Sequence, residues 1–300
     1  MPPVLLLTYK RADTTQKVFE AIRSIKPTDL FVASNAARGH IEGEEKMVDS
    51  VRQLTEQVDW PCKVRRLYRD QHLNCQQSIS TAIDWFFSEV EEGLILEDDC
   101  VPHPDFFKFA ETMLSRYKDQ KEVMMISGTS YLFDNYDTMK ESYYFMRYFS
   151  IWGWATWRDR WALYDREMNE WPELRANGWL KSIFKRGDMA RYFRDLFDAI
   201  ANQQIDTWDY QWIYSCLRNN GRALVSGLNL VANIGNVGEH GASSDEENLF
   251  LNMKTFDQKE IVFRHSTDID EHEENRAFDT VIRHMPFRWR LKLKLARLLG

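Results

Sequence analysis

The stretch that decides the fold of this chain is Gly93-Leu94-Ile95-Leu96-Glu97-Asp98-Asp99-Cys100, a short apolar run that ends on three consecutive acids. A continuous apolar run without alternation is typical of a strand buried on both faces in an α/β sheet. Acids directly after such a strand lie at its carboxyl end, where open α/β sheets bind their ligands. The stretch therefore predicts a central strand that presents Glu97, Asp98 and Asp99 to a binding site.

These three acids repel one another, so we expect a cation among them. Oxygen ligands with open positions favour a hard divalent ion, Mg²⁺ or Mn²⁺, that also binds the phosphates of a substrate. The next residues predict a tight turn into a helix, with Pro104 and Asp105 in its first turn. The alternative is a solvated turn that only caps this helix, but three acids directly on a buried strand favour the metal site.

Length and composition favour a single large α/β domain, because 300 residues without an evident linker can fill one core. The net charge of -7 disfavours nucleic acid as a partner of the whole chain. The N-terminus lacks the features of a signal peptide, no apolar run is long enough to span a bilayer, and the four scattered cysteines suit a reducing compartment. We therefore expect a cytoplasmic protein, with a domain at 1–262 and a tail at 263–300.

A strand-turn-helix unit followed by a second strand opens the chain, with buried strands expected at 4–8 and 30–35. Their ends carry Thr8, Ser34 and Asn35, beside which a nucleotide base and ribose could bind. Further along, helices are expected from 77 and over 106–117, a strand over 123–128, and a pair of strands at 222–226 and 228–231.

Tryptophan is concentrated in one section, since eight of the eleven tryptophans fall between 152 and 212. Flat rings suit the faces of sugars, and Gly153 allows close approach to the backbone. Most of these rings are expected to be core, with Trp152 or Trp154 the first candidates for carbohydrate contact and Trp208 another.

The segment 206–212 begins a further helix and has two interpretations. In one, Asp206 is the N-cap and Asp209 is a favourable acid in the first turn. In the other, Asp209 is a general base whose pKa is raised by the apolar surfaces of Trp208 and Trp212. We favour the base. A glycine-rich loop follows at 233–244, and its His240 is either a metal or phosphate ligand or a solvated loop residue.

The run ILEDDCVPHPDFFKFAETML at 95–114 resembles the metal-binding segment of GT-A-fold glycosyltransferases. It is most similar to that of the N-acetylglucosaminyltransferase I group, with a weaker resemblance elsewhere to family-two-like bacterial glycosyltransferases. The resemblance implies a GT-A-type, Rossmann-like mixed sheet flanked by helices. It also implies that Asp99 binds the metal directly, while Asp98 and Glu97 contact the nucleotide ribose and the waters of the metal.

The same resemblance implies roles for residues elsewhere in the chain. Arg11 would lie near the nucleotide, Ser34 and Asn35 near a uracil, and one of Arg69, Asn74 and Gln76 at the donor. The Gly-Trp loop at 152–154, the catalytic acid Asp209 and the loop histidine His240 occur in the family's order. The family has Trp-Asp-Asp-Trp around its catalytic acid, which Trp208-Asp209-Tyr210-Gln211-Trp212 matches loosely. For Arg11 the alternative is an ordinary solvated cation at the start of a helix.

The expected function is that of a metal-dependent inverting glycosyltransferase, moving a hexosyl or N-acetylhexosaminyl group from a UDP-sugar to a hydroxyl of a glycan acceptor. One alternative is a sugar-phosphate nucleotidyltransferase, although the glycine-rich loop of that class is missing from Thr8-Tyr9-Lys10-Arg11. The other is a non-catalytic carbohydrate-binding protein, which would not explain the acids.

The last sixteen residues, 285–300, carry five cations and no acid, so the rest of the chain has a net charge of -7 - 5 = -12. Wound as a helix, they place apolar side chains near one stripe with cations at its rim, the pattern of a helix on an anionic membrane surface. Membrane binding through this helix would fit an acceptor that is built on a lipid carrier at the cytoplasmic face. The alternative is a helix docked on the acidic body or on another subunit.

Overall fold

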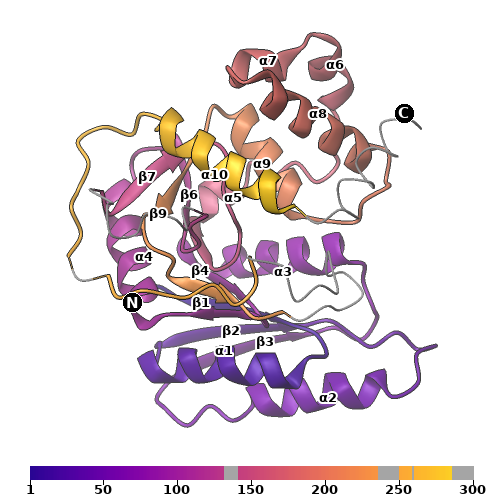
Figure 1. Cartoon of the computed structure of the whole chain (residues 1–300). Coiled ribbons are helices and arrows are strands. Elements are labelled where there is room, and N and C mark those ends of the chain that lie inside the picture. Colours follow the sequence, from indigo (N-terminus) through magenta and orange to yellow (C-terminus); the bar gives the residue numbers. More distant parts are fainter. Residues whose placement is uncertain (132–140, 236–249, 259, 286–300) are drawn as a thin grey trace.

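The computed structural model describes residues 1–131, 141–235, 250–258 and 260–285, and its elements are labelled in Figure 1. The strands are β1 Val4–Thr8, β2 Asp29–Ser34, β3 Lys63–Tyr68, β4 Glu92–Glu97, β5 Cys100–Pro102, β6 Val123–Ser127, β7 Tyr143–Met146, β8 Trp154–Trp157, β9 Arg222–Ser226 and β10 Val231–Asn233. The helices are α1 Ala12–Ile25, α2 Glu44–Thr55, α3 Cys75–Glu89, α4 Pro104–Tyr117, α5 Arg158–Trp161, α6 Trp171–Ala176, α7 Trp179–Ile183, α8 Gly187–Ala201, α9 Asp209–Arg218 and α10 Glu271–His284.

One mixed sheet runs through the described part of the molecule, with eight strands in the order β3-β2-β1-β4-β8-β6-β9-β7. β1, β2, β3 and β4 are parallel, whereas β8 is antiparallel to both β4 and β6. The carboxyl ends of β1, β2 and β4 therefore meet at one edge of the sheet. This is the edge at which the sequence placed its ligand site.

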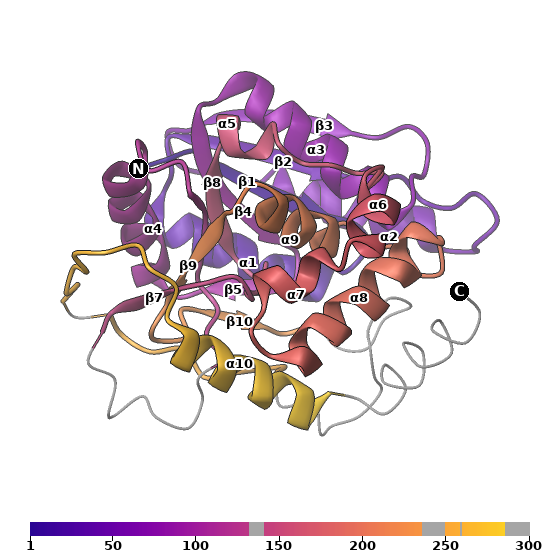
Figure 2. The same cartoon turned by 90° about the horizontal axis from the view of Figure 1, so that it is seen from above.

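The sheet separates two hydrophobic clusters because successive side chains of a strand point to opposite faces. In β1, Val4 and Leu6 pack with α1 and α4, whereas Leu5 and Leu7 pack in the cluster that includes α3, α8 and α9. Figure 1 shows α1 and α2 below the β1–β3 half of the sheet and α3 above it. In the perpendicular view of Figure 2, α9 lies near the centre, with α6, α7 and α8 beside it and α10 along one border.

The prediction of one α/β domain built on a mixed sheet flanked by helices is confirmed. The strand pair expected at 222–226 and 228–231 is wrong. β9 lies inside the large sheet between β6 and β7, whereas β10 pairs antiparallel with β5. β10 thus lies beside the residues that directly follow the three acids, where Asn233 is opposite Cys100.

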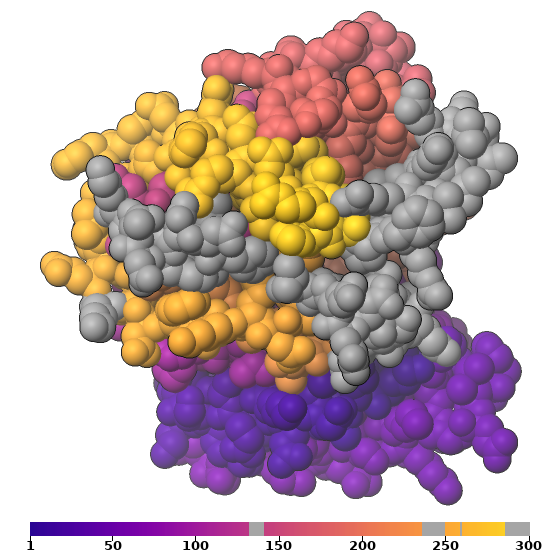
Figure 3. All heavy atoms as spheres, viewed as in Figure 1, coloured from indigo at the N-terminus to yellow at the C-terminus, as the bar shows by residue number. Residues whose placement is uncertain are grey.

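Residues 263–285, which the sequence assigned to a separate tail, contain α10, a helix that packs into the domain. Ala277 and Phe278 are 3% and 1% exposed and belong to the cluster on the α3, α8 and α9 side. In the space-filling view of Figure 3, α10 (yellow) lies between the red α6–α8 region and the orange segment that precedes it. None of the helices in the described residues is both long enough and apolar enough to cross a membrane.

Candidate active site

The three acids lie at the end of β4, as the sequence predicts. Leu94, Ile95 and Leu96 are fully buried between β1 and β8, and the chain turns at Asp98 and Asp99 before β5. The side chains of Asp98 and Asp99 are only 5% and 13% exposed. A solvated turn would leave both carboxylates in water, so their burial favours a site that binds positive charge.

Arg11, in the turn after β1, pairs with both aspartates. One terminal nitrogen of its guanidinium donates to Asp98 Oδ1 and lies 2.9 Å from Asp99 Oδ2. The backbone N–H of Tyr9 donates to the other oxygen of Asp98 over 3.2 Å. The interpretation of Arg11 as an ordinary solvated cation is therefore wrong. Two carboxylate oxygens from adjacent residues converge on one positively charged nitrogen.

The electrostatics of the cluster follow from crowding several acids in a buried place. Burial raises the pKa of Glu97 well above its usual range, and the charges of Asp99, Asp98 and Asp209 raise it further. Burial also raises the pKa of Asp98 to about 6, although Arg11 opposes this change. The pKa of Arg11 is raised because the attraction of Asp98 and Asp99 outweighs its burial. Positive charge is thus favoured beside these acids.

The strand β10 and the residues after it form a wall beside Asp99. The backbone N–H of Ile234 donates to Asp99 O over 2.8 Å, and that of Gly235 donates to Asn233 Oδ1, also over 2.8 Å. A Cβ atom on Gly235 would lie 2.3 Å from Asp99 Oδ2, so only glycine allows this approach. His240, expected as a metal or phosphate ligand, lies outside the described residues.

Asp209 is the first residue of α9, and its charge acts on the acid cluster. Burial raises the pKa of Asp209, while the hydroxyl of Thr207 donates to its Oδ1 and opposes this rise. Asp209 in turn contributes to the raised pKa of Glu97, of Cys75 and of Tyr131. The structure thus brings the candidate base and the end of β4 into one electrostatic neighbourhood.

Asp206 does not cap the helix that begins at Asp209, so the expected N-cap is wrong, whereas Asp209 does lie in the first turn of α9 as an acid. The N-cap of α9 is Trp208, which has no side-chain capping bond. The carboxylate of Asp206 accepts instead from Cys75 N over 3.0 Å and from Gln76 N over 3.2 Å. These are the first amides of α3, where a carboxylate satisfies unpaired donors and the helix dipole. Asp206 therefore ties the segment that carries Asp209 to the loop before α3.

The tryptophans expected at a sugar are mostly core. Trp154 is fully buried and Trp208 is 3% exposed, and their rings stack at 5.8 Å with an interplanar angle of 27°. The ring of Trp154 has no face open to a ligand, and the ring of Trp208 has almost none. This burial corrects the expectation that these two rings contact a sugar. Gly153 has a φ of +67°, and a Cβ there would lie 2.6 Å from Val231 Cγ2. This glycine serves packing, and the half-buried Trp152 remains as the sugar candidate.

Sequence reasoning missed a group of tyrosines near Asp209. Burial is the main cause of a raised pKa at four tyrosines, and the charge of Asp209 contributes at each of them: Tyr131, Tyr148, Tyr164 and Tyr210. Tyr131 also meets Trp152 edge to face, with ring centroids 6.1 Å apart. For Tyr131 and Tyr148 the signal in the sequence was the aromatic content around 131–149. Hydroxyl groups on apolar rings suit recognition of a polar ligand such as a sugar.

The polar residues expected at the nucleotide base lie together, but their side chains form hydrogen bonds within the protein. Thr8 Oγ1 donates to Ala33 O over 3.1 Å, and Asn74 caps α3 by accepting from Gln77 N over 2.8 Å. Asn35 donates to Leu73 O over 2.8 Å and accepts from the N–H of the same residue over 3.1 Å. These bonds fasten the loop before α3 to the ends of β1 and β2.

Ser34 belongs to the same arrangement, because Arg52 Nε donates to its hydroxyl over 3.3 Å. At the first position of α2 lies a buried acid that sequence reasoning missed. Glu44 is 1% exposed and pairs with Lys10 Nζ at 2.7 Å and with Arg38 at 2.6 Å. The bonds from Arg38 are the main reason that the pKa of Glu44 is well below its usual range. The sequence held no signal for this cluster.

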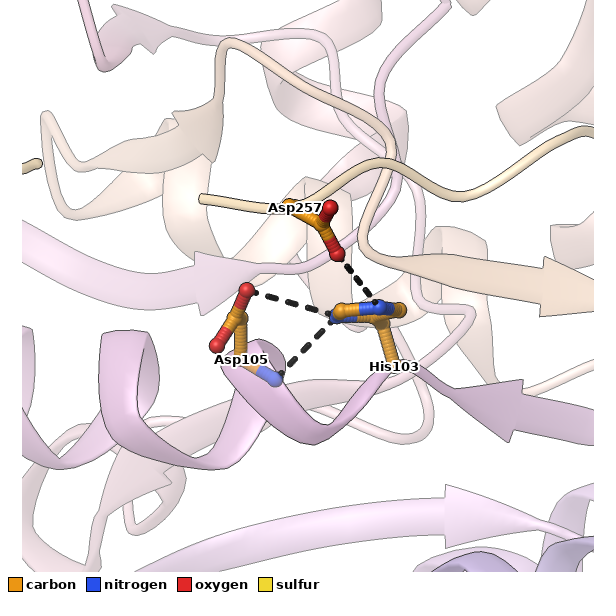
Figure 4. A group of neighbouring side chains, drawn as sticks. All are labelled: His103, Asp105 and Asp257. Carbon is orange, nitrogen blue, oxygen red and sulfur yellow. Dashed lines mark hydrogen bonds and ion pairs between the residues drawn. The ribbon is translucent and has the colours of Figure 1, made fainter. Parts of the chain in front are cut away.

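A second group of possible metal ligands, drawn in Figure 4, lies at the start of α4. His103, Asp105 and Asp257 each offer a ligand atom, and these atoms lie within 4.8 Å of one another. His103 Nδ1 accepts from Asp105 N over 3.3 Å, which leaves the proton on Nε2, 3.2 Å from Asp257 Oδ1. An imidazole engaged in this way caps α4 and tethers Asp257 rather than ligating a metal.

Comparison with known proteins finds no matching family model and no matching curated protein. Among solved structures, HddC from Yersinia pseudotuberculosis is 11% identical with a TM-score of 0.32, over 53% of this chain and 78% of that one. The 4-diphosphocytidyl-2C-methyl-D-erythritol synthase from Anaerococcus prevotii is 10% identical with a TM-score of 0.34, over 73% of this chain and 98% of that one. UDP-glucose pyrophosphorylase complexed with UDP-glucose is 12% identical with a TM-score of 0.25, over 49% of this chain and 62% of that one.

These likenesses carry no argument about function, because all three TM-scores are below 0.5. None of the three proteins is named as a glycosyltransferase. The resemblance to the N-acetylglucosaminyltransferase I group therefore stays a prediction from the sequence.

Proposed function

We propose that this chain is a metal-dependent inverting glycosyltransferase that uses a nucleotide-diphosphate sugar, a UDP-sugar first among the candidates. The acceptor is a hydroxyl of a glycan, with a lipid-linked glycan as one case. The observation that carries the proposal is the buried pair Asp98 and Asp99 at the carboxyl end of β4, within electrostatic reach of Asp209. The reaction needs acids that bind a metal and a carboxylate that acts as base, and Asp98 and Asp99 would serve as the first and Asp209 as the second.

The donor set fits a divalent cation. Two carboxylate oxygens already converge on one guanidinium nitrogen, and oxygen-only ligands suit Mg²⁺ or Mn²⁺. Asp99 would be the direct ligand, and Asp98 and Glu97 would contact the ribose and metal-bound waters. The bound ion would offset the negative charge that develops on the leaving nucleoside diphosphate.

Asp209 would remove the proton from the acceptor hydroxyl. A carboxylate is a weak base in water, but burial raises the pKa of Asp209 and so makes its carboxylate a stronger proton acceptor. Asp206 would hold the segment of Asp209 against the loop before α3, so that the base keeps a fixed position relative to the donor. A single displacement with an activated hydroxyl inverts the configuration of the transferred sugar.

A sugar-phosphate nucleotidyltransferase is the second candidate. The same sheet edge could bind a nucleoside triphosphate. Against it, the turn Thr8-Tyr9-Lys10-Arg11 has no glycine, and the side chain of Arg11 is directed to the acids.

One experiment separates the candidates. The protein is incubated with a panel of nucleotide-sugars and Mn²⁺ or Mg²⁺, and release of free nucleoside diphosphate is measured. In parallel, nucleoside triphosphates with sugar phosphates are tested for release of pyrophosphate. The proposed function predicts metal-dependent release of nucleoside diphosphate, absent in Asp99→Asn. Pyrophosphate release alone would support the nucleotidyltransferase, and glycan binding without either product would support a non-catalytic protein.

A further inference from the structure

Arg11 lies against Asp99 Oδ2, one of the two oxygens that a metal could bind. Its guanidinium nitrogen lies 2.9 Å from Asp99 Oδ2 and also donates to Asp98. On the other side of the same carboxylate, Cys100 Sγ lies 3.4 Å from Oδ1. Gly235 lies so close to the same carboxylate that a Cβ atom added to it would be 2.3 Å from Oδ2. Both oxygens of Asp99 are therefore engaged within the protein.

A divalent ion binds a carboxylate oxygen at about 2.1 Å, closer than a hydrogen-bonded nitrogen. An ion on Asp99 Oδ2 would then lie against the guanidinium, and two positive charges at such short range repel strongly. Arg11 and a metal consequently compete for Asp99.

Arg11 is able to leave. Its side chain is 35% exposed, so it can turn toward solvent without emptying a packed core. Asp98 would keep its bond from Tyr9 N when the guanidinium departs. A diphosphate is the natural new partner, because a guanidinium matches phosphate oxygens with parallel hydrogen bonds.

We propose that Arg11 closes the metal site of the free protein and that a nucleoside diphosphate opens it by taking Arg11 as its partner. This inference rests on the proposed function, since it concerns the metal and diphosphate of that site. It adds that the two ligands bind cooperatively: the free protein binds Mn²⁺ weakly, and Mn²⁺ and diphosphate each strengthen the binding of the other. A constitutive structural ion pair would give no such coupling.

The test measures two affinities in the full-length protein and in Arg11→Gln. Mn²⁺ binding without nucleotide is followed by the electron paramagnetic resonance of free Mn²⁺, and UDP binding at saturating Mn²⁺ by calorimetry. We expect Arg11→Gln to bind Mn²⁺ alone about tenfold or more tightly than the wild type, and to bind UDP about tenfold or more weakly. The two affinities should change in opposite directions, whereas a variant that is only misfolded would lose both.

Two further variants serve as controls. Lys10→Gln removes the neighbouring cation, which pairs with Glu44 instead of the acids, and should leave the affinity for Mn²⁺ alone within about twofold of the wild type. Arg11→Lys keeps a charge near the acids but loses the planar donor set, so Mn²⁺ affinity should stay near the wild-type value while UDP binding weakens. Thermal melts confirm that all variants fold.

Unchanged or weaker Mn²⁺ binding in a folded Arg11→Gln, with wild type that binds Mn²⁺ and UDP, would overturn the inference and leave the proposed function standing. Absence of Mn²⁺ binding in every variant, with and without UDP, would instead overturn the metal site itself.

Discussion

At the scale of single residues, the buried environment of Asp209 predicts how turnover depends on pH. Burial raises the pKa of its carboxyl, and the active base is the deprotonated form. Turnover should therefore rise with pH through a pKa above the ordinary value of about 3.9 for aspartate. Asp209→Asn should lower kcat by about 10²-fold to 10⁴-fold with donor affinity unchanged. The measurement is a pH profile of kcat and kcat/KM for both proteins.

Thr207 offers the matched control for that assignment. Its hydroxyl donates to Asp209 Oδ1 and lowers the pKa of the carboxyl, so Thr207→Val should move the acid limb of the profile to higher pH. If the acid limb stays in place in Thr207→Val, or persists in Asp209→Asn, then it reports the ionisation of another group.

A second prediction concerns the close approach of Gly235 to Asp99. Gly235→Ala would place a methyl group 2.3 Å from Asp99 Oδ2 and force either the carboxylate or the loop to move. Metal-dependent donor binding should fall by about tenfold or more, since a shift of about 1 Å at a ligand has effects of this size. Gly187→Ala is the control because nothing lies within 4 Å of its added Cβ. Equal donor binding by Gly235→Ala and Gly187→Ala would contradict the importance of the close approach between Gly235 and Asp99.

The acids of the site could be read from the sequence, but their partners could not. An apolar run that stops on carboxylates is a local pattern, and it located Glu97, Asp98 and Asp99 correctly at the end of β4. The pairing of Arg11 with Asp98 spans 87 residues, and that of Asp206 with Cys75 spans 131. Only the tertiary structure brings such groups together. The burial of Trp154 likewise depends on rings from α5 and α9.

At the scale of elements, the sequence predicted the strands that are continuous apolar runs and missed a helix near the C-terminus. α10 has clear end signals: Asp270 caps it by accepting from Glu273 N over 3.1 Å, and Arg283 and His284 lie in its last turn. Such signals could have located it. The strand pairing of β10 could not be predicted, because short strands adjacent in sequence normally form a hairpin.

A buried ion pair helps to dock α10 on the domain. Glu274, with 2% of its side chain exposed, accepts from the guanidinium of Arg147, directly after β7, through both carboxylate oxygens, and the closest nitrogen of the guanidinium lies 2.6 Å away. Glu274→Ala leaves the cation without its partner and should lower the free energy of unfolding by about 3–5 kcal/mol. Chemical denaturation measures this loss.

The double variant Glu274→Leu with Arg147→Met is the companion to that experiment. It replaces both charges with apolar groups and should recover much of the lost stability, because no buried charge is left unpaired. A small loss in Glu274→Ala, below about 1 kcal/mol, would mean that the pair behaves as a surface salt bridge.

At the scale of the whole molecule, the final prediction concerns residues 286–300, which lie outside the described part of the chain. Their five cations follow the end of α10 at His284 and contrast with a net charge of -12 elsewhere, from -7 - 5. We predict that the full-length protein sediments with vesicles containing anionic lipid, that added salt weakens this binding, and that truncation after Met285 abolishes it. Vesicles of neutral lipid are the control. Equal sedimentation of both proteins would contradict membrane binding, and a lower melting temperature of the truncated protein would favour docking of the segment on the acidic body instead.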